Sequence, residues 1–314
     1  MLTSSGLSAL TCVVIALVKP CDYVLIVDMA YKPLREFCCW YLKRWGVGFD
    51  FCDPADGRSL RCLLRHNVCL VHLESPASST FEMQDIKALC GTVHYRNPER
   101  FVSVDNTWAG CLLVEPIALG VDLSLAAMTR CPSGASDLMV GAISANRRAS
   151  VALLRRCKVV LGICGSDYSS CSVLKGLSGL SVRMVHRLCV YALTIAKFLE
   201  AVSGLVNARC SALPSFSYYC LRKRDYLLTN SVLSFVSDCF DGANRLQLAR
   251  RFLNNLKVFG SGWSWGGCAS LAAPVLLAHS AFTSDFGGPV VRLNVGLDWF
   301  TRSNIGFGER LLIA

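Results

Sequence analysis

The sequence has few charged residues and lacks a hydrophobic run long enough to cross a membrane. Only 17% of its 314 residues are charged and the mean hydropathy is +0.43, whereas soluble domains carry about a quarter charged residues. A membrane span needs about 20 uninterrupted apolar residues. The apolar run at 7–18 ends at Lys19-Pro20, and the uncharged run at 258–284 is interrupted by several glycines. We therefore expect a soluble protein with no membrane span.

The chain also lacks the cysteine spacing of a metal site or a disulfide framework. It has 18 cysteines but no C-x-x-C pair, and its five histidines do not alternate with cysteine at zinc-ligand spacing. Many cysteines lie inside apolar stretches, as Cys189 does between Leu188 and Val190, where cysteine packs as a small hydrophobic residue. No secretion signal is recognisable. These observations predict reduced thiols, no metal and a cytoplasmic location.

Basic residues are in excess, but they do not form a nucleic-acid-binding pattern. The net charge is +10, from 23 Arg and 9 Lys against 22 acidic residues. The basic residues are scattered singly or in pairs and are not interleaved with aromatic residues, which is typical of solvated helix faces. The sequence therefore predicts no nucleic-acid partner.

The order of short apolar runs and helical stretches predicts an α/β fold. In the first half, strands are expected at 23–27, 47–51, 68–73, 101–104 and 121–125, with a helix over 33–45. Polar residues follow several of these strands, at the edge where parallel sheets bind ligands. A long helix is expected over 181–202. Beyond it, strands at 231–236 and 290–295 enclose a helix at 242–256, which indicates a smaller α+β unit.

Three segments carry a resemblance to a known family. Residues 104–109 (VDNTWA) resemble the strand-end motif of the pyridoxal phosphate (PLP) enzymes of cysteine and methionine metabolism, and residues 120–137 resemble their cofactor-lysine segment. Residues 264–267 (SWGG) and 292–297 (RLNVGL) form the third match, and a tryptophan after that serine is similar to the cystathionine β-lyase branch. Residues 74–76 (ESP) and 223–226 (KRDY) also match.

The resemblance covers essentially the whole chain and implies an aspartate aminotransferase-like, type I PLP fold. In that fold a large domain with a mostly parallel sheet is followed by a smaller α+β domain. We assign residues 1–178 to the large PLP-binding domain and 179–314 to the C-terminal domain that completes the substrate site. A homo-oligomer is also implied.

The resemblance implies a set of cofactor ligands. Asp105 matches the carboxylate that pairs with the pyridine nitrogen of PLP, although a lone Asp after a strand can also cap a turn. Tyr31 matches the tyrosine stacked on the ring, with an ordinary half-buried tyrosine as the alternative. The phosphate is expected at Ser5, Gly6 and Leu7, whose backbone N–H groups open a helix, and at the Thr129 hydroxyl.

The remaining implied residues face the substrate, a small sulfur amino acid. Arg292 matches the arginine that holds its α-carboxylate through a fork of N–H donors, which lysine cannot reproduce. Ser264 and Trp265 are expected to line the same site, and Ser78 is expected to face the cofactor.

The chain departs from the family at the catalytic lysine, because Arg130 stands in its place and no lysine lies between Lys87 and Lys158. In the family that lysine holds PLP covalently, takes the substrate Cα proton and helps the sulfur leaving group depart. A guanidinium stays protonated near neutral pH. Losing general acid–base catalysis typically costs about 10²–10⁴-fold in rate. Covalent attachment of PLP is therefore doubtful.

A second departure is that the chain begins at the phosphate-loop segment, without the family's N-terminal arm. We expect a truncation that weakens phosphate binding and the usual oligomer.

Two functions stay open. One is a cystathionine β-lyase that eliminates homocysteine from cystathionine, leaving pyruvate and ammonia. The other is a catalytically inactive descendant that at most binds PLP non-covalently.

Overall fold

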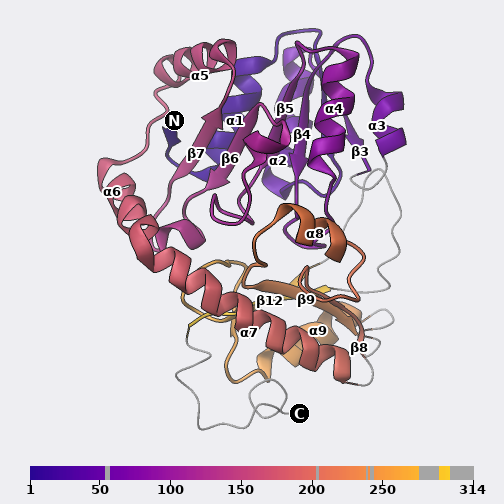
Figure 1. Ribbon diagram of the computed structural model, residues 1–314, viewed down its shortest axis with the longest axis vertical. Helices are drawn as coiled ribbons and strands as arrows, with labels where there is room; N and C mark the ends of the chain where they lie inside the picture. The colour runs from indigo at the N-terminus through magenta and orange to yellow at the C-terminus, as the bar shows by residue number, and fades with distance from the viewer. Residues whose placement is uncertain (54–56, 203–204, 238–239, 241–243, 276–289, 298–314) are drawn as a thin grey trace.

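Two β-sheets lie one above the other along the long axis of the molecule (Figure 1). The computed structural model describes residues 1–53, 57–202, 205–237, 240, 244–275 and 290–297. The first sheet uses strands between residues 2 and 145, and the second uses strands between residues 205 and 294. The predicted α/β architecture with a mostly parallel first sheet and a smaller α+β part is confirmed.

The first sheet has seven strands in the order β1-β7-β6-β5-β4-β2-β3. They are β1 (Leu2–Thr3), β2 (Tyr23–Val27), β3 (Gly48–Cys52), β4 (Val68–Glu74), β5 (Phe101–Asp105), β6 (Leu123–Ala127) and β7 (Gly141–Ala145). Neighbours from β3 to β6 pair in parallel, while β7 is antiparallel to both β6 and β1. The parallel strands are nearly continuous apolar runs because helices cover both of their faces.

The helices around this sheet are α1 (Gly6–Leu17), α2 (Lys32–Phe37), α3 (Gly57–Leu63), α4 (Ile86–Arg96) and α5 (Arg148–Val160), with short helical turns η1 (Cys38–Leu42), η2 (Lys43–Trp45), η3 (Pro116–Leu119) and η4 (Cys131–Ser133). Several of these helices, α3, α4 and α5 among them, were not predicted from the sequence. The apolar run at 7–18 is helix α1. It packs against β6, β7 and α5, with Ala9 and Cys12 fully buried. A helix that is apolar on most of its sides is stable only when other elements bury it, and α1 is such a core helix.

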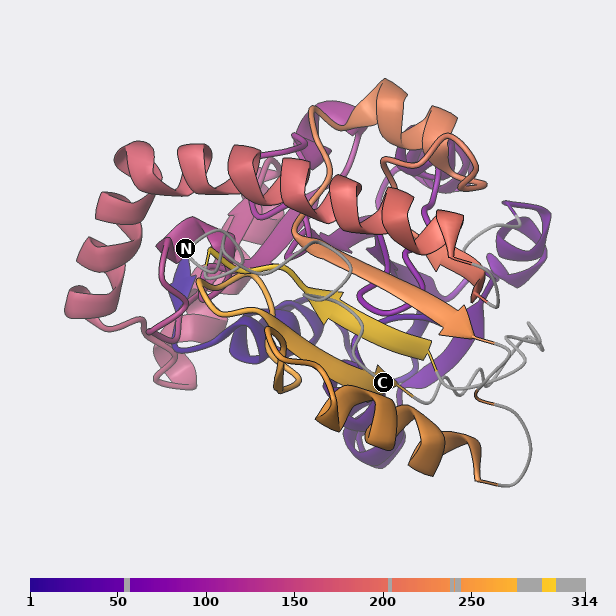
Figure 2. The ribbon, with the colours of Figure 1, turned by 90° about the horizontal axis from the view of Figure 1, so that it is seen from below.

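The second sheet is covered by a helix on each face (Figure 2). Its strands, in the order β10-β11-β12-β9-β8, are β8 (Leu205–Arg209), β9 (Val232–Ser237), β10 (Gly260–Ser261), β11 (Leu271–Val275) and β12 (Val290–Asn294). The long helix α7 (Ser181–Ala201) packs on β8 and β9, and α9 (Arg245–Asn254) packs on β11. The remaining helices are α6 (Asp167–Lys175), η5 (Gly176–Leu180) and α8 (Tyr219–Asp225).

Most predicted elements lie within two residues of the observed ones. The strand expected at 121–125 begins at Leu123, and the Asp122 N–H just before it already bonds the Val102 carbonyl of β5 at 2.9 Å. Residues 242 and 243 of the helix expected at 242–256 lie outside the described residues, as do 276–284 of the uncharged run and 298–314 of the expected second domain. The predicted division at 178/179 lies within η5, just before α7, and stays a prediction.

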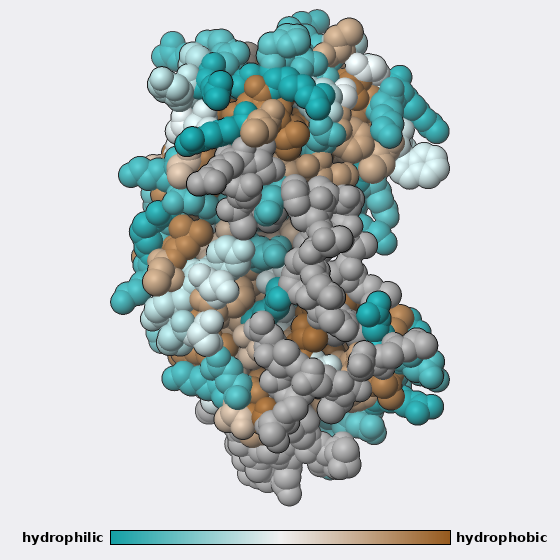
Figure 3. All heavy atoms as spheres, turned by 90° about the vertical axis from the view of Figure 1, so that its right-hand side faces the viewer, coloured by the Kyte–Doolittle hydropathy of each residue, from teal (hydrophilic) through white to brown (hydrophobic). Residues whose placement is uncertain are grey.

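Apolar side chains also reach the surface. Val159, Val160 and Leu174 are each at least 70% exposed on or near α5 and α6. On the face shown in Figure 3, hydrophilic side chains cover much of the upper part, with apolar atoms visible between them. Across the described ranges, no helix combines the length and apolar character that a membrane crossing requires.

Candidate functional site

Two buried carboxyl groups lie side by side at the carboxyl edge of the first sheet. Glu74 ends β4, Asp105 ends β5, and the two residues are paired in register. Glu74 is 4% exposed and Asp105 is 6% exposed. Burial raises the pKa of Glu74 to about 8, with the neighbouring Asp105 charge as the second cause. Burial also raises the pKa of Asp105, against hydrogen bonds from Thr107 and the positive charge of Arg130.

Glu74 joins two loops of this edge through their backbones. Its Oε2 accepts the Tyr31 N–H at 2.6 Å, and its Oε1 accepts the Ser78 N–H at 3.0 Å. Tyr31, at the start of α2, is therefore held by its backbone while its side chain stays 39% exposed. Sequence reasoning had matched Glu74 to a family segment without giving it a role. The Ser78 side chain also hydrogen-bonds Glu74, but the two backbone N–H contacts could not be predicted from residue types, because nearly every residue has a backbone N–H.

The predicted phosphate-binding residues gather where α1 begins and β6 ends. The Ser5 hydroxyl caps α1 by accepting the Ser8 N–H at 3.0 Å. The N–H groups of Gly6 and Leu7 belong to the first turn, which has no acceptors within its own helix. A Cβ atom on Gly6 would lie 2.6 Å from the Ala127 Cβ, so only glycine allows this approach. Thr129, two residues beyond β6, bonds the Val140 backbone, accepting its N–H at 3.3 Å.

Arg130 is fixed against the segment of residues 263–265. Its Nη1 donates to the Ser264 hydroxyl at 2.5 Å and to the Trp265 carbonyl at 3.1 Å, and its guanidinium carbon lies 5.1 Å from the centre of the Trp265 ring. Burial lowers the pKa of Arg130, while Tyr31, Cys131 and Asp105 act in the opposite direction. The structure thus brings the predicted residues Arg130, Ser264 and Trp265 into direct contact.

Arg292 reaches the same segment from β12. Its Nη2 donates to the Trp263 carbonyl at 2.7 Å and its Nη1 donates to the Ser78 carbonyl at 3.3 Å. The side chain is buried, which lowers its pKa to about 10, and the like charge of Arg130 contributes in the same direction. Ser78 therefore links Glu74 through its N–H to Arg292 through its carbonyl. No described contact bears on whether the Ser78 side chain faces a cofactor, and that stays a prediction.

The loop after β10 closes onto the turn after Arg130. Gly266 has φ +76°, and its N–H donates to Oδ1 of Asn294 at 2.9 Å. Its carbonyl accepts the Ser136 hydroxyl at 3.0 Å. A Cβ atom on Gly266 would lie 3.0 Å from the Arg130 Cβ. Asn294 was part of a matched segment, but its role in holding this loop depends on contacts between residues 28 positions apart and was missed.

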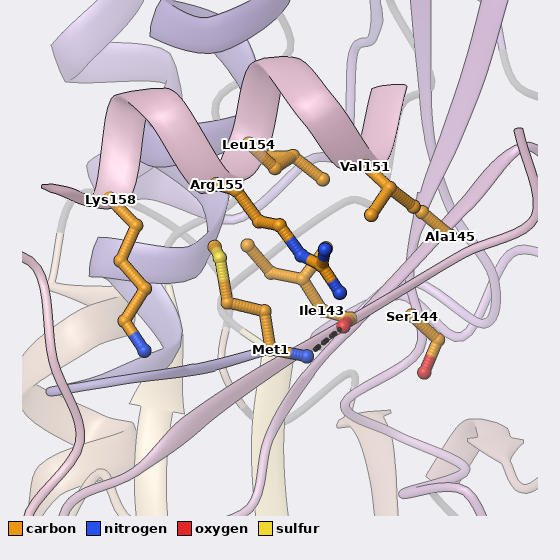
Figure 4. A pocket seen from close by; sticks show the side chains of 8 residues that line it. All are labelled: Met1, Ile143, Ser144, Ala145, Val151, Leu154, Arg155 and Lys158. Carbon is orange, nitrogen blue, oxygen red and sulfur yellow. Dashed lines mark hydrogen bonds between the residues drawn. The ribbon is translucent and has the colours of Figure 1, made fainter. Parts of the chain in front are cut away.

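A separate pocket of about 550 Å³ lies between α5 and β7 (Figure 4). Arg155, Lys158 and apolar residues of α5 face Met1 and Ile143 across it, and the Met1 amine donates to the Ile143 carbonyl at 2.8 Å. None of the predicted site residues lines this pocket. It is therefore distinct from the carboxyl edge where those residues meet.

Known proteins share this arrangement of elements. The solved structure of cystathione gamma lyase from Micromonospora echinospora superposes with a TM-score of 0.83 at 25% identity, covering 96% of this chain and 80% of that chain. A relative from Rhizobium johnstonii is 39% identical over 300 residues, which is 95% of this chain and 74% of that protein. The cystathionine beta-lyase of Bordetella avium is 32% identical, covering 95% of this chain and 73% of its own length.

The model of one family matches residues 1–300, and that family is described as Cys/Met metabolism PLP-dependent enzyme. The match includes the first sheet, α7, the second sheet and the segments that carry Asp105, Arg130 and Arg292. Pyridoxal phosphate is the cofactor of the enzymes so described. The chain therefore belongs to the PLP-dependent enzymes of cysteine and methionine metabolism.

Proposed function

We propose that this protein binds PLP non-covalently and has lost most or all of a cystathionine β-lyase-type C–S elimination. The proposal rests on Arg130, which the resemblance assigns to the lysine position and whose side chain is held by Ser264 and Trp265. The lineage of the proposed activity rests on relatives such as the cystathionine beta-lyase of Bordetella avium. The substrate class is a small sulfur amino acid.

The donors and acceptors at the carboxyl edge fit PLP. Asp105 is buried, and no cation of the described residues lies within 4.0 Å of its carboxylate. A protonated pyridine nitrogen would therefore supply the positive charge that a buried carboxylate needs. Beside it, the buried Asn106 Oδ1 has no hydrogen-bond partner in the described part of the chain. These two groups leave acceptors available for a ligand.

The other end of the cofactor would lie at the start of α1. The N–H groups of Gly6 and Leu7 are suited to a phosphate because a helix N-terminus presents unpaired donors and a favourable dipole. Ser5 and Thr129 supply hydroxyl groups nearby, and Tyr31 would stack on the ring. When bound, PLP supplies an electron sink for negative charge that develops on the substrate.

The protein's own residues would hold the substrate but not move its proton. Arg292 would bind the α-carboxylate, and Ser264 and Trp265 would line the site. Arg130 cannot act as the general base, because a guanidinium remains charged near neutral pH even where burial lowers its pKa. It also cannot form the covalent bond that an amine forms with an aldehyde.

Borohydride reduction tests this proposal. The full chain is incubated with PLP, reduced and digested, and peptides are examined by mass spectrometry, with Arg130→Lys as the matched positive control. We expect no PLP on any lysine of the wild type and PLP on residue 130 of the variant. A parallel absorbance titration should show saturable PLP binding by the wild type. PLP attached to a wild-type lysine would refute the non-covalent assignment, and an unsaturable titration would refute cofactor binding.

A further inference from the structure

Arg130 and Arg292 converge on one short segment from opposite parts of the chain. Arg130 lies in the turn after β6 and donates to Ser264 and Trp265, whereas Arg292 lies on β12 and donates to Trp263. The charge of each acts on the same Tyr31 side chain. The two guanidinium groups are therefore close neighbours, and their mutual repulsion contributes to the lowered pKa of Arg292.

Neither guanidinium forms a salt bridge with a described residue, although the more distant Asp105 charge acts on Arg130. Over the described ranges, no Asp or Glu oxygen lies within 4.0 Å of Arg130 or Arg292. The two nearby carboxyl groups, Glu74 and Asp105, are buried with raised pKa values, and Glu74 is bound to backbone N–H groups. Buried charges in proteins are normally paired, because an unpaired one loses its hydration without compensation. Two adjacent cations without a salt bridge therefore favour a bound anion.

Both arginines keep donors that are not used by described residues, and those of Arg130 form a complete side-on edge for a carboxylate. Arg130 uses only Nη1 in its hydrogen bonds, so Nε and Nη2 donate to none of the described residues. These two nitrogens form the side-on edge of a guanidinium, which binds both oxygens of one carboxylate. Arg292 uses Nη1 and Nη2 for carbonyl groups and keeps Nε unbonded to any described residue.

We infer that Arg130 and Arg292 together bind a small dicarboxylate, with one carboxylate on each guanidinium. The Ser264 and Trp265 contacts hold Arg130 so that its open edge is preorganised for this ligand. A dicarboxylate neutralises both charges at once, whereas a monocarboxylate leaves one uncompensated. The substitution at position 130 thus replaces a reactive amine by an anion-binding group. This inference goes beyond the proposed function and does not require PLP to bind.

The test uses the full chain without PLP, titrated by calorimetry at constant ionic strength with succinate, butyrate or inorganic phosphate. We expect succinate to bind at least tenfold more tightly than butyrate or phosphate. Equal affinity for succinate and butyrate would overturn the two-arginine site, and tighter binding of phosphate would overturn the dicarboxylate assignment. This selectivity is measured on the wild type, so it does not depend on the folding of a variant.

Variants then locate the site. Arg130→Gln should weaken succinate binding at least tenfold, and Arg130→Lys should weaken it several-fold because the charge remains but the fork is lost. Arg155→Gln, in the separate pocket between α5 and β7, should leave succinate affinity unchanged. Loss of binding in Arg155→Gln with full binding in Arg130→Gln would place the anion in that other pocket and overturn the inference.

Discussion

Arg130 and Trp265, which are 135 residues apart, are joined twice. Nη1 of the arginine donates to the tryptophan carbonyl at 3.1 Å, and the guanidinium carbon lies 5.1 Å from the centre of the indole ring. A cation over an aromatic face contributes about 0.5–2 kcal/mol, the larger value when the pair is desolvated. The arginine is therefore held in one orientation.

Arg130→Lys should raise the rate of pyruvate release from cystathionine by about 10²-fold or more, because an amine restores general acid–base catalysis and covalent attachment of PLP. The measurement is steady-state turnover with PLP in excess, beside Arg148→Lys, an exposed substitution at the start of α5. A wild type that already releases pyruvate within a few-fold of the Arg130→Lys rate would contradict the loss of activity.

Asp105→Asn should weaken PLP binding by about 10–100-fold, since a hydrogen bond to a charged group contributes about 1.5–3 kcal/mol. The expected change is in the dissociation constant from an absorbance titration at neutral pH. Glu99→Gln, which removes an exposed carboxylate elsewhere, serves as the control. Equal PLP affinity in Asp105→Asn and the wild type would show that this carboxylate does not pair with the cofactor.

Gly266→Ala should destabilise the protein more than Gly46→Ala, although both glycines have positive φ, +76° and +69°. A left-handed conformation costs an alanine about 1–2 kcal/mol at either position. Nothing lies within 4 Å of a Cβ on Gly46, whereas a Cβ on Gly266 meets the Arg130 Cβ at 3.0 Å. We expect a further cost of about 1–3 kcal/mol at Gly266 from overpacking. Chemical denaturation measures the free energy of unfolding of both variants. Equal losses would mean that the loop shifts to accommodate the added Cβ atom of Gly266→Ala.

The buried His72 should make the protein sensitive to acid. Its Nδ1 lies 2.9 Å from the Ser103 hydroxyl, its Nε2 has no partner in the described part of the chain, and burial lowers its pKa to about 4. Between pH 6.5 and pH 4 the unfolded chain gains a proton that the folded chain does not. The free energy of unfolding therefore falls as the pH falls, by about 3 kcal/mol from this group.

His72→Asn removes this titration, and its unfolding free energy should decline less steeply between pH 7 and pH 4. His66→Gln, an exposed histidine, should follow the wild-type slope. Parallel curves for His72→Asn and the wild type would indicate that His72 is protonated in the folded protein. The slope is the diagnostic quantity, because the variant also loses packing at every pH.

Parallel strands were predictable because they are short apolar runs bounded by polar residues. The strand at 23–27 matches β2, and that at 68–73 differs from β4 by one residue. Strand β7 was missed because its sequence, GAISA, is rich in small residues and it pairs antiparallel to its neighbours. Strand β11 contains Pro274. Proline has no N–H to donate to a neighbouring strand, so a proline argues against a strand unless its position needs no donor.

The residues of the candidate site were identifiable by resemblance, but their contacts were not. Position 130 could be recognised from the motifs on both sides of it. The Arg130 side chain bonds Ser264, which is 134 residues away in the sequence. This contact depends on how the two sheets are stacked and on the positive φ of Gly266. The bridge made by Glu74 is similarly hidden, because backbone N–H groups are present at almost every residue.

Helix α1 delays the completion of the first sheet during synthesis. Its partners β6, β7 and α5 all come more than a hundred residues later, and Cys12 lies 3.8 Å from Cys157, sulfur to sulfur. At about 5–20 residues per second, the ribosome makes that intervening chain in roughly 5 to 30 seconds. For this time only β1, α2 and β4 are present among the elements that pack against this largely apolar helix. The full packing surface of α1 is therefore complete only after α5 has been made, when about half of the chain has been synthesised.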